Sequence, residues 1–231
     1  MKKIISLILA TLCITLVFCS CGKKGTEAQT TAPGATNAAE NNSEVLTDGD
    51  YSYVKLEDGT VKIVSYNKAE SNGEVKVPEK LGGMNVTVIG ANTFTEKQNV
   101  TKVRLPRFVT KVESYAFNKS PVVSVLFNQI TDDTAMTIES YAFNECPNIV
   151  KVDFSKAVKK LESSAFYLGK TPRQLTFTID PVYIDSNAID TGRGFDNLRL
   201  CHSGDISNYK NLKAFADIYG IELVLNTVNA Q

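Results

Sequence analysis

The residues best suited to chemistry are a cysteine and a histidine that stand together, Cys201 and His202, directly after Leu200. A thiolate beside an imidazole can bind a metal or act as a nucleophile and its base. The chain contains a single histidine, so no second imidazole is available to complete a metal site or a catalytic set. We therefore expect His202 to be a loop residue at the end of a strand.

Two further segments contain residue types that occur in ligand-binding loops. Asp132 and Asp133 supply half of a calcium site, but the residues around them lack the glycine and the spaced carboxylates that such loops use. Gly82 and Gly83 have no phosphate-loop context, so we expect a turn there. The sequence predicts a protein that is not an enzyme, with no catalytic residue, no metal and no cofactor.

Composition limits the class of partner. The chain has 231 residues, of which 25 Lys and Arg balance 25 Asp and Glu, so there is no basic excess for neutralising phosphates. We expect no nucleic-acid partner. Apolar residues make up 43% of the chain, which is an ordinary globular composition and excludes collagen, coiled coil and wholesale disorder.

The first twenty residues have the layout of an export signal. Lys2 and Lys3 precede a mostly apolar run, residues 4–18, which is too short to span a bilayer comfortably. The next residues resemble a bacterial lipobox, because the small residue Ser20 stands directly before Cys21. This resemblance implies a lipoprotein signal peptide over residues 1–20, lipid attachment at Cys21 and anchoring to a membrane. Secretion without a lipid is the alternative.

After Cys21 the composition becomes polar. Residues 22–44 consist largely of Gly, Thr, Ala, Asn, Ser and Gln and cannot recover the entropy cost of ordering. We assign residues 21–47 to the lipidated cysteine and a flexible linker. Beyond it, alternating residues on both sides of Asp58-Gly59 predict a β-hairpin over residues 51–63, and residues 75–77 predict a strand ended by Pro78.

The strongest pattern is a self-similarity with a period near 23 residues. Its anchor residues are 23, 26, 23 and 23 residues apart, and each has an apolar residue five positions earlier. The anchors are Phe94, Phe117, Phe143, Phe166 and Ile189, with Ile89, Val112, Ile138, Leu161 and Ile184 before them. Apolar pairs after the anchors predict strands with inward residues at Val103 and Leu105, Val125 and Phe127, Val152 and Phe154, Leu175 and Phe177, and Leu198 and Leu200. Stacked units would join these residues into one core.

The repeat itself carries a family resemblance. The spacing from Val100 through Leu105-Pro106 to Ala116-Phe117, which recurs from Ile149 to Phe166, resembles the BspA-like leucine-rich repeat family of bacterial cell-surface proteins. Cys146 falls where that family often has a core cysteine. The asparagine of the commoner leucine-rich repeat is missing, so its backbone ladder is not assumed. The resemblance implies an adhesive surface protein.

The expected fold is mainly β, a right-handed leucine-rich-repeat solenoid of about five 23-residue units over residues 48–228. An N-terminal hairpin precedes the units. An amphipathic helix over residues 205–219, ended by Gly220, and a strand over residues 221–225 close the C-terminal end. Cys146 and Cys201 occupy different edges two units apart, so we expect no disulfide between them.

Residues between the inward strand positions should face solvent. These are Lys102, Arg104, Ser124, Leu126, Lys151, Asp153, Gln174, Thr176, Asn197 and Arg199. Within this set Lys102, Arg104 and Lys151, with Asp153, form a candidate face for an acidic protein partner, although exposed strand positions are polar in any case. An alternative edge is formed by Tyr115 and Tyr141, each two residues before its anchor.

Two functions therefore remain open. The first is a lipid-anchored surface protein that presents a repeat scaffold to a protein or extracellular-matrix ligand. The second is a carbohydrate-capturing surface lipoprotein, which would use the tyrosine edge because sugars stack on flat rings.

Overall fold

The computed structural model describes residues 44–68, 73–97, 99–128, 135–155, 157–167, 174–190, 195 and 198–225. All of them belong to one unit of the chain, residues 42–231. The predicted signal peptide, Cys21, the linker as far as residue 43, Asp132, Asp133 and Asn197 lie outside the described residues.

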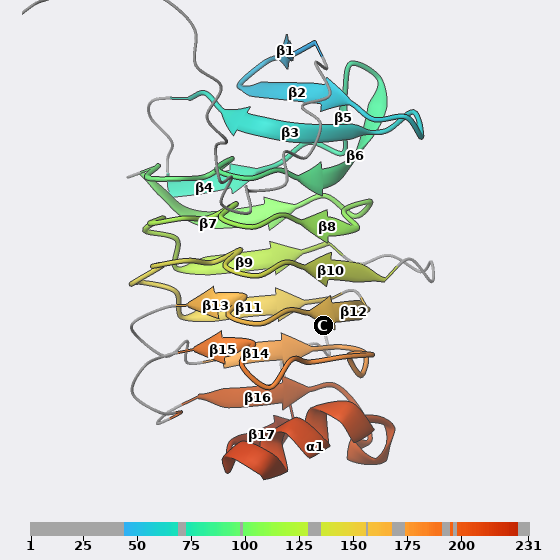
Figure 1. The fold of residues 1–231 in the computed structure, drawn as a ribbon, viewed down its shortest axis with the longest axis vertical. Helices are drawn as coiled ribbons and strands as arrows, with labels where there is room; N and C mark the ends of the chain where they lie inside the picture. The colour runs from blue at the N-terminus through green and yellow to red at the C-terminus, as the bar shows by residue number, and fades with distance from the viewer. Residues whose placement is uncertain are drawn as a thin grey trace, which may run out of the picture. The chain divides into compact units, whose positions relative to one another are not determined.

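The described residues form a mainly β stack with one α-helix, as predicted (Figure 1). The first strands are β1 (Leu46–Asp48), β2 (Tyr51–Lys55), β3 (Val61–Tyr66), β4 (Gly73–Lys76), β5 (Lys80–Leu81), β6 (Met84–Ile89), β7 (Val100–Leu105), β8 (Lys111–Val112) and β9 (Ser124–Phe127). They are followed by β10 (Met136–Ile138), β11 (Lys151–Phe154), β12 (Val158–Leu161), β13 (Phe166–Tyr167), β14 (Gln174–Phe177), β15 (Ile189–Asp190), β16 (Arg199–His202), the 3-10 helix η1 (Ile206–Asn208), α1 (Lys210–Tyr219) and β17 (Glu222–Leu225).

Two largely parallel sheets run along the stack. One has the order β1-β2-β3-β6-β8-β10-β12, and the other has the order β17-β16-β14-β11-β9-β7-β4. From β3 to β14 successive turns contribute one strand to each sheet, whereas β16 and β17 belong to the second sheet only. The turns lie on one another from β1 at the top of Figure 1 to α1 at the bottom. This is the predicted solenoid.

The predicted hairpin is the antiparallel pair β2–β3, and Gly59 takes the left-handed conformation that its turn requires (φ 79°). The second strand of the hairpin, β3, also belongs to the stack of repeats. β3 pairs in parallel with β6, so it adds a turn ahead of the five predicted units. β1 starts at Leu46, two residues before the predicted domain boundary.

The core contains the predicted column of anchors. The rings of Phe94, Phe117, Phe143 and Phe166 are stacked with centroids 5.0, 4.9 and 4.7 Å apart. Tyr66 of β3 extends the column at its N-terminal end, 5.7 Å from Phe94. A second column, formed by Phe127, Phe154 and Phe177, stacks on the inner side of the other sheet. Burial of these large rings removes apolar surface from water and stabilises the stack.

The last repeat differs from its prediction by two residues. β16 aligns Leu200 with Leu175 and His202 with Phe177, whereas we expected Leu198 and Leu200 at these places. The spacing from Leu175 to Leu200 is 25 residues, so two extra residues enter before the strand and shift its register. His202 is therefore the last residue of β16 and is buried, and its assignment to a loop is wrong.

The C-terminal end is closed by the predicted helix and strand. Leu212, Phe215 and Ala216 face the core, and Gly220 ends α1 in a left-handed conformation (φ 63°). The helix starts later than predicted, because Asp205 caps η1 instead. The backbone N–H groups of Asn211 and Leu212 donate to Asp180, which therefore satisfies the first turn of α1 from 31 and 32 residues away.

Of the helical segments the structure describes, none has the length and apolar character needed to cross a membrane.

Candidate functional site

The fold brings the predicted strand-face residues together on one sheet. Lys102 and Arg104 belong to β7, and Lys151 and Asp153 belong to β11. β9 lies between these strands and places Ser124 in register with both Lys102 and Lys151. The face thus exists as a continuous surface on β7, β9 and β11.

Carboxylates on the same face neutralise most of its positive charge. Arg104 Nε lies 2.6 Å from Glu74 Oε1, and Lys102 Nζ lies 3.5 Å from Glu74 Oε2. Lys151 Nζ lies 3.4 Å from Asp153 Oδ2. The Arg104 hydrogen bond, helped by the charges of Lys102 and Arg104, holds the pKa of Glu74 below its usual value. Glu74, which the sequence did not single out, therefore competes with any acidic partner for Lys102 and Arg104.

Two of the predicted outward residues are not accessible. Asp153 is 8% exposed and Thr176 is fully buried, so the expectation that they face solvent is wrong. Both lie on the outer side of the sheet, but they are short side chains beside longer ones. Lys151 covers Asp153 through their ion pair, and Gln174 donates to the Thr176 hydroxyl at 3.0 Å.

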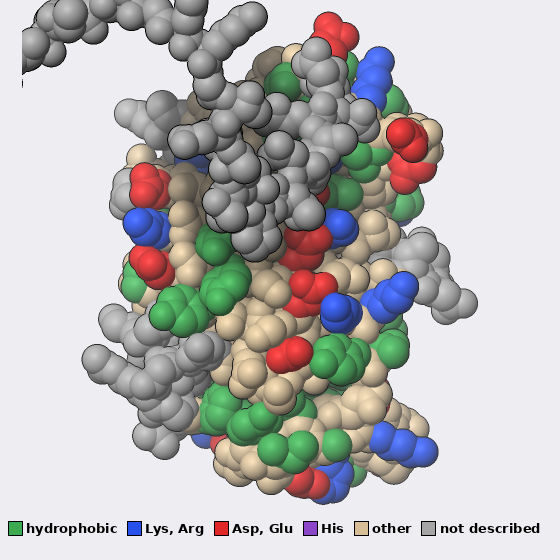
Figure 2. All heavy atoms as spheres, viewed as in Figure 1, with side chains coloured by type: hydrophobic (Ala, Val, Ile, Leu, Met, Phe, Trp, Pro, Cys, Tyr) green, Lys and Arg blue, Asp and Glu red, His purple; other side chains and the backbone are tan. Residues whose placement is uncertain are grey.

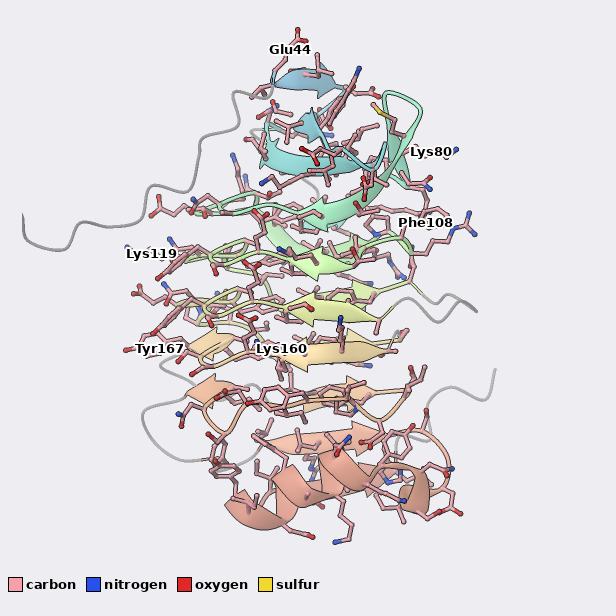
Figure 3. All side chains as sticks on the ribbon, turned by 45° about the vertical axis from the view of Figure 1, so that its right-hand side comes forward. Glu44, Lys80, Phe108, Lys119, Lys160 and Tyr167 are labelled. Carbon is pink, nitrogen blue, oxygen red and sulfur yellow. The ribbon has the colours of Figure 1, made fainter. Side chains whose placement is uncertain are left out.

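The alternative edge contains three tyrosines. The rings of Tyr115 and Tyr141 are stacked, with centroids 5.6 Å apart and an angle of 3° between their planes. Tyr167, at the end of β13, meets Tyr141 at 5.9 Å in an edge-to-face contact. These side chains are 37–41% exposed. Tyr115, Tyr141 and Tyr167 are called the tyrosine edge below; Figure 3 shows Tyr167 pointing outward on the same side as Lys119.

The backbone at this edge is unusual. Tyr115 and Tyr141 have φ angles of 61° and 60°, in the left-handed region that bulky residues rarely adopt. Asn92 and Ser164 hold the same place and conformation in the neighbouring repeats. Each residue at this place donates its N–H to the carbonyl oxygen of the equivalent residue in the next repeat, as Tyr115 does to Tyr141 at 3.1 Å. The ladder imposes the conformation, at a cost of about 1–3 kcal/mol for a residue that does not favour it.

Nucleophilic and metal-binding groups are buried and dispersed. Cys146 and Cys201 are free and buried, as the expectation of no disulfide requires. Burial raises the pKa of the Cys146 thiol to about 12 and also raises the pKa of Cys201, so neither is an activated thiolate. Within the described ranges, no group of three or more His, Cys, Asp or Glu residues is placed to hold a metal.

A family comparison agrees with this geometry. The family model described as the BspA type leucine rich repeat region matches residues 81–196 in six copies, where we predicted about five units. The match covers 116 of the 231 residues, half of the chain. The chain belongs to the BspA-type leucine-rich repeat family.

Three solved structures are similar to this chain. A leucine rich cell surface protein from Faecalibacterium prausnitzii is 19% identical, with a TM-score of 0.44, and the similarity covers 71% of this chain and 56% of that one. A leucine-rich repeat protein from Bacteroides ovatus is 16% identical, with a TM-score of 0.47, over 78% of this chain and 41% of that one. A leucine rich repeat protein from T. pallidum is 12% identical, with a TM-score of 0.31, over 78% and 98%. The chain thus spans about half the length of the first two. No curated protein matches it.

A glutamate recurs at one place of the repeat and links successive turns. Glu113, Glu139 and Glu162 stand four residues before their anchors, and each accepts a hydrogen bond from a backbone N–H of the preceding repeat, namely Ala91, Ser114 and Ser140. Lys62, Lys111 and Lys160 pair with them in the same order. The sequence analysis missed this ladder, although the repeated Glu at a constant distance from the anchor was a readable signal.

Tyr167 was also missed. It stands one residue after its anchor, not two before, so it does not share the position of Tyr115 and Tyr141 in the repeat. The fold nevertheless places its ring against Tyr141. No spacing rule in the sequence indicates this contact, because it depends on how adjacent turns stack.

Proposed function

We propose that this protein is exported, is anchored to the membrane by a lipid on Cys21, and presents its repeat solenoid at the bacterial cell surface for protein–protein interaction or adhesion. The observation that supports the interaction is the stack itself. Successive turns place equivalent side chains in continuous columns, and solenoids use such extended surfaces to bind partners. The proposed partner is a protein or an extracellular-matrix ligand.

Export and anchoring are supported by residues 1–21. A charged start, a short apolar run and a small residue before Cys21 are the features that precede a lipidated cysteine. Two acyl chains would give stable attachment, and the polar residues that follow would separate the solenoid from the bilayer.

The substitution Cys21→Ser tests the anchor. We expect it to move the protein from the membrane fraction to the soluble fraction, or to block processing, and to abolish incorporation of labelled palmitate. The unfolding midpoint of the solenoid should not change, because Cys21 precedes the repeats. Cys146→Ser serves as the matched cysteine control and should leave fractionation unchanged. A mutant that still fractionates with membranes and still incorporates palmitate would contradict the anchor.

Carbohydrate capture is the second candidate function. The exposed rings of Tyr115 and Tyr141 favour it, because sugar-binding sites commonly present aromatic rings. A glycan array probed with the protein would test it, with loss of binding in Tyr115→Asn/Tyr141→Asn as the expected result for a sugar site at this edge.

A further inference from the structure

The tyrosine edge is held in shape before any partner arrives. Tyr141 is contacted by Tyr115 on one side and by Tyr167 on the other. The backbone of Tyr115 and Tyr141 is held by hydrogen bonds between repeats. Little side-chain or backbone freedom therefore remains to be lost on binding, and preorganised surfaces bind at lower entropy cost.

The small polar residues beside the rings form hydrogen bonds within the fold. Ser114 and Ser140 precede the first two tyrosines, and Asn118 and Asn144 form an amide ladder with Asn144 Nδ2 2.7 Å from Asn118 Oδ1. The hydroxyls of Ser114 and Ser140 donate to Glu139 and Glu162, and Asn144 is buried, so the contact area offered here comes from the tyrosine rings, which antibody paratopes also use as rigid contact residues.

The stacking also limits the kind of partner. Tyr115 and Tyr141 cover one face of each other at 5.6 Å, a separation that leaves no room for a sugar ring between them. Tyr141 has a ring on each side, Tyr115 and Tyr167, so neither of its faces is open to a sugar. Sugars need an open face, whereas ring edges suit aromatic side chains and the carbonyl oxygens of a polypeptide. The geometry favours a protein over a glycan.

The charges near the edge are mixed. Glu113, Glu139 and Glu162 are paired with lysines, as described above. On the other side of the rings, exposed Lys119 lies between the equivalent positions of exposed Glu96 and Glu145. Figure 2 shows acidic and basic side chains interspersed on the visible face of the stack, without a large area of one sign. A partner that matches this surface carries little net charge.

The left-handed backbone also bears on the role of the two rings. Tyrosine is a poor residue for these two positions, and Asn92 shows that the repeat accepts asparagine, which tolerates the conformation better. Asn92 and Ser164 show that the repeat does not require an aromatic ring at this place, which agrees with a surface role for the two rings.

We propose that the tyrosine edge, Tyr115, Tyr141 and Tyr167, is the surface through which the solenoid binds a protein partner with an uncharged patch of aromatic side chains and backbone carbonyl groups. The proposal rests on the interaction function above and replaces the strand face of Lys102, Arg104 and Lys151 as its site. The partner's rings would pack against the tyrosine ring edges, as Tyr167 already does with Tyr141.

A displayed library of random peptides, selected on the full chain, supplies the probe. We expect selected peptides to lose at least about tenfold in affinity for Tyr115→Asn/Tyr141→Asn, which corresponds to about 1.4 kcal/mol. Tyr183→Asn is the matched control, because Tyr183 is an exposed tyrosine outside the edge. That control and the variant Lys102→Glu/Arg104→Glu/Lys151→Glu should each change affinity by less than about twofold. Salt should change the affinity little between about 50 and 500 mM, because few charges take part.

Hydrogen exchange of the unmodified protein with bound peptide gives a readout that does not depend on a variant folding. Protection confined to residues 113–119, 139–145 and 164–167 supports the edge. Protection of β7 and β11 instead, with loss of binding in the triple Glu variant, overturns the tyrosine edge but leaves the interaction function standing. If a glycan array shows binding that Tyr115→Asn/Tyr141→Asn abolishes and no peptide is selected, both the protein partner and the protein-interaction function are overturned.

Discussion

At residue 202 the chain places an imidazole where the three preceding repeats have a phenylalanine. The register of β16 puts His202 after Phe127, Phe154 and Phe177 in the second aromatic column. Its Nδ1 atom is buried and has no hydrogen-bond partner, and its ring lies 5.1 Å from the ring of Tyr209. A buried polar atom without a partner lowers stability. His202 is thus a core residue that fits its position imperfectly.

The substitution His202→Phe should therefore raise the free energy of unfolding by about 1–2 kcal/mol, because it continues the aromatic column and removes the unpaired nitrogen. Denaturant unfolding measures this change. The reverse substitution at the equivalent place, Phe177→His, is the control and should lower the unfolding midpoint. A lower midpoint for His202→Phe would contradict this account of the site.

At the scale of elements, Glu113, Glu139 and Glu162 link each repeat to the one before it by hydrogen bonds. We call these three residues the glutamate ladder. Glu162 illustrates the electrostatics. Burial alone would raise its pKa, but hydrogen bonds from Lys160 Nζ and the Ser140 N–H, with the charge of Lys160, outweigh burial and lower it. The ionised carboxylate is favoured in the folded protein, so the ladder contributes stability in its charged form.

This lowered pKa predicts the pH dependence of the Glu162→Gln variant. A carboxyl whose folded pKa lies below its unfolded value stabilises the protein above the unfolded value, here 4.5, and loses that contribution as pH falls through the folded pKa. Glu162→Gln should be less stable than the parent at pH 7, and the difference should shrink below pH 4.5. Thermal unfolding across pH checks this. Glu57→Gln, in the exposed β2–β3 turn, should show no such trend, and a gap that widens in acid would refute the assignment.

At the scale of the whole solenoid, each turn contacts mainly its two neighbours. The ring of Phe166 stacks on Phe143 and meets Phe154 edge-on, so it joins the two aromatic columns. Repeat proteins gain much of their stability from such interfaces between neighbouring turns. A substitution that destabilises one turn should therefore destabilise the adjacent turns first.

We expect Phe166→Ala to lower the free energy of unfolding by about 3–5 kcal/mol, because it empties a fully buried position. Lys102→Ala, at a partly exposed ion pair, should cost less than about 0.5 kcal/mol. Denaturant unfolding gives both values. Hydrogen exchange should show the largest loss of protection in Phe166→Ala within β11, β12 and β14. A uniform loss from β2 to β17 would argue against unfolding by neighbouring turns.

The repeat period, the anchors, the hairpin, the capping helix and the absence of a Cys146–Cys201 disulfide were all readable from the sequence. These features depend on periodic apolar positions and on local turn and cap signals, which any segment carries in its own residues. The shifted register of β16 was harder, because Leu198 and Leu200 fit the apolar pattern better than Leu200 and His202, the residues that the strand actually aligns with Leu175 and Phe177.

The accessibility of surface residues required the folded chain. Alternation along β11 and β14 placed Asp153 and Thr176 on the outer side of the sheet, but longer neighbours cover both. Three other contacts join residues that are 26–32 positions apart. Glu74 accepts a hydrogen bond from Arg104, Asp180 accepts one from the backbone of Leu212, and the ring of Tyr167 contacts that of Tyr141. Asp153 and Thr176 are covered by residues of their own strands, whereas Glu74, Asp180 and Tyr167 meet groups from another turn, whose offset is set by packing. The physical reason is that a periodic pattern specifies which way a side chain points but not which group covers, pairs with or stacks on it.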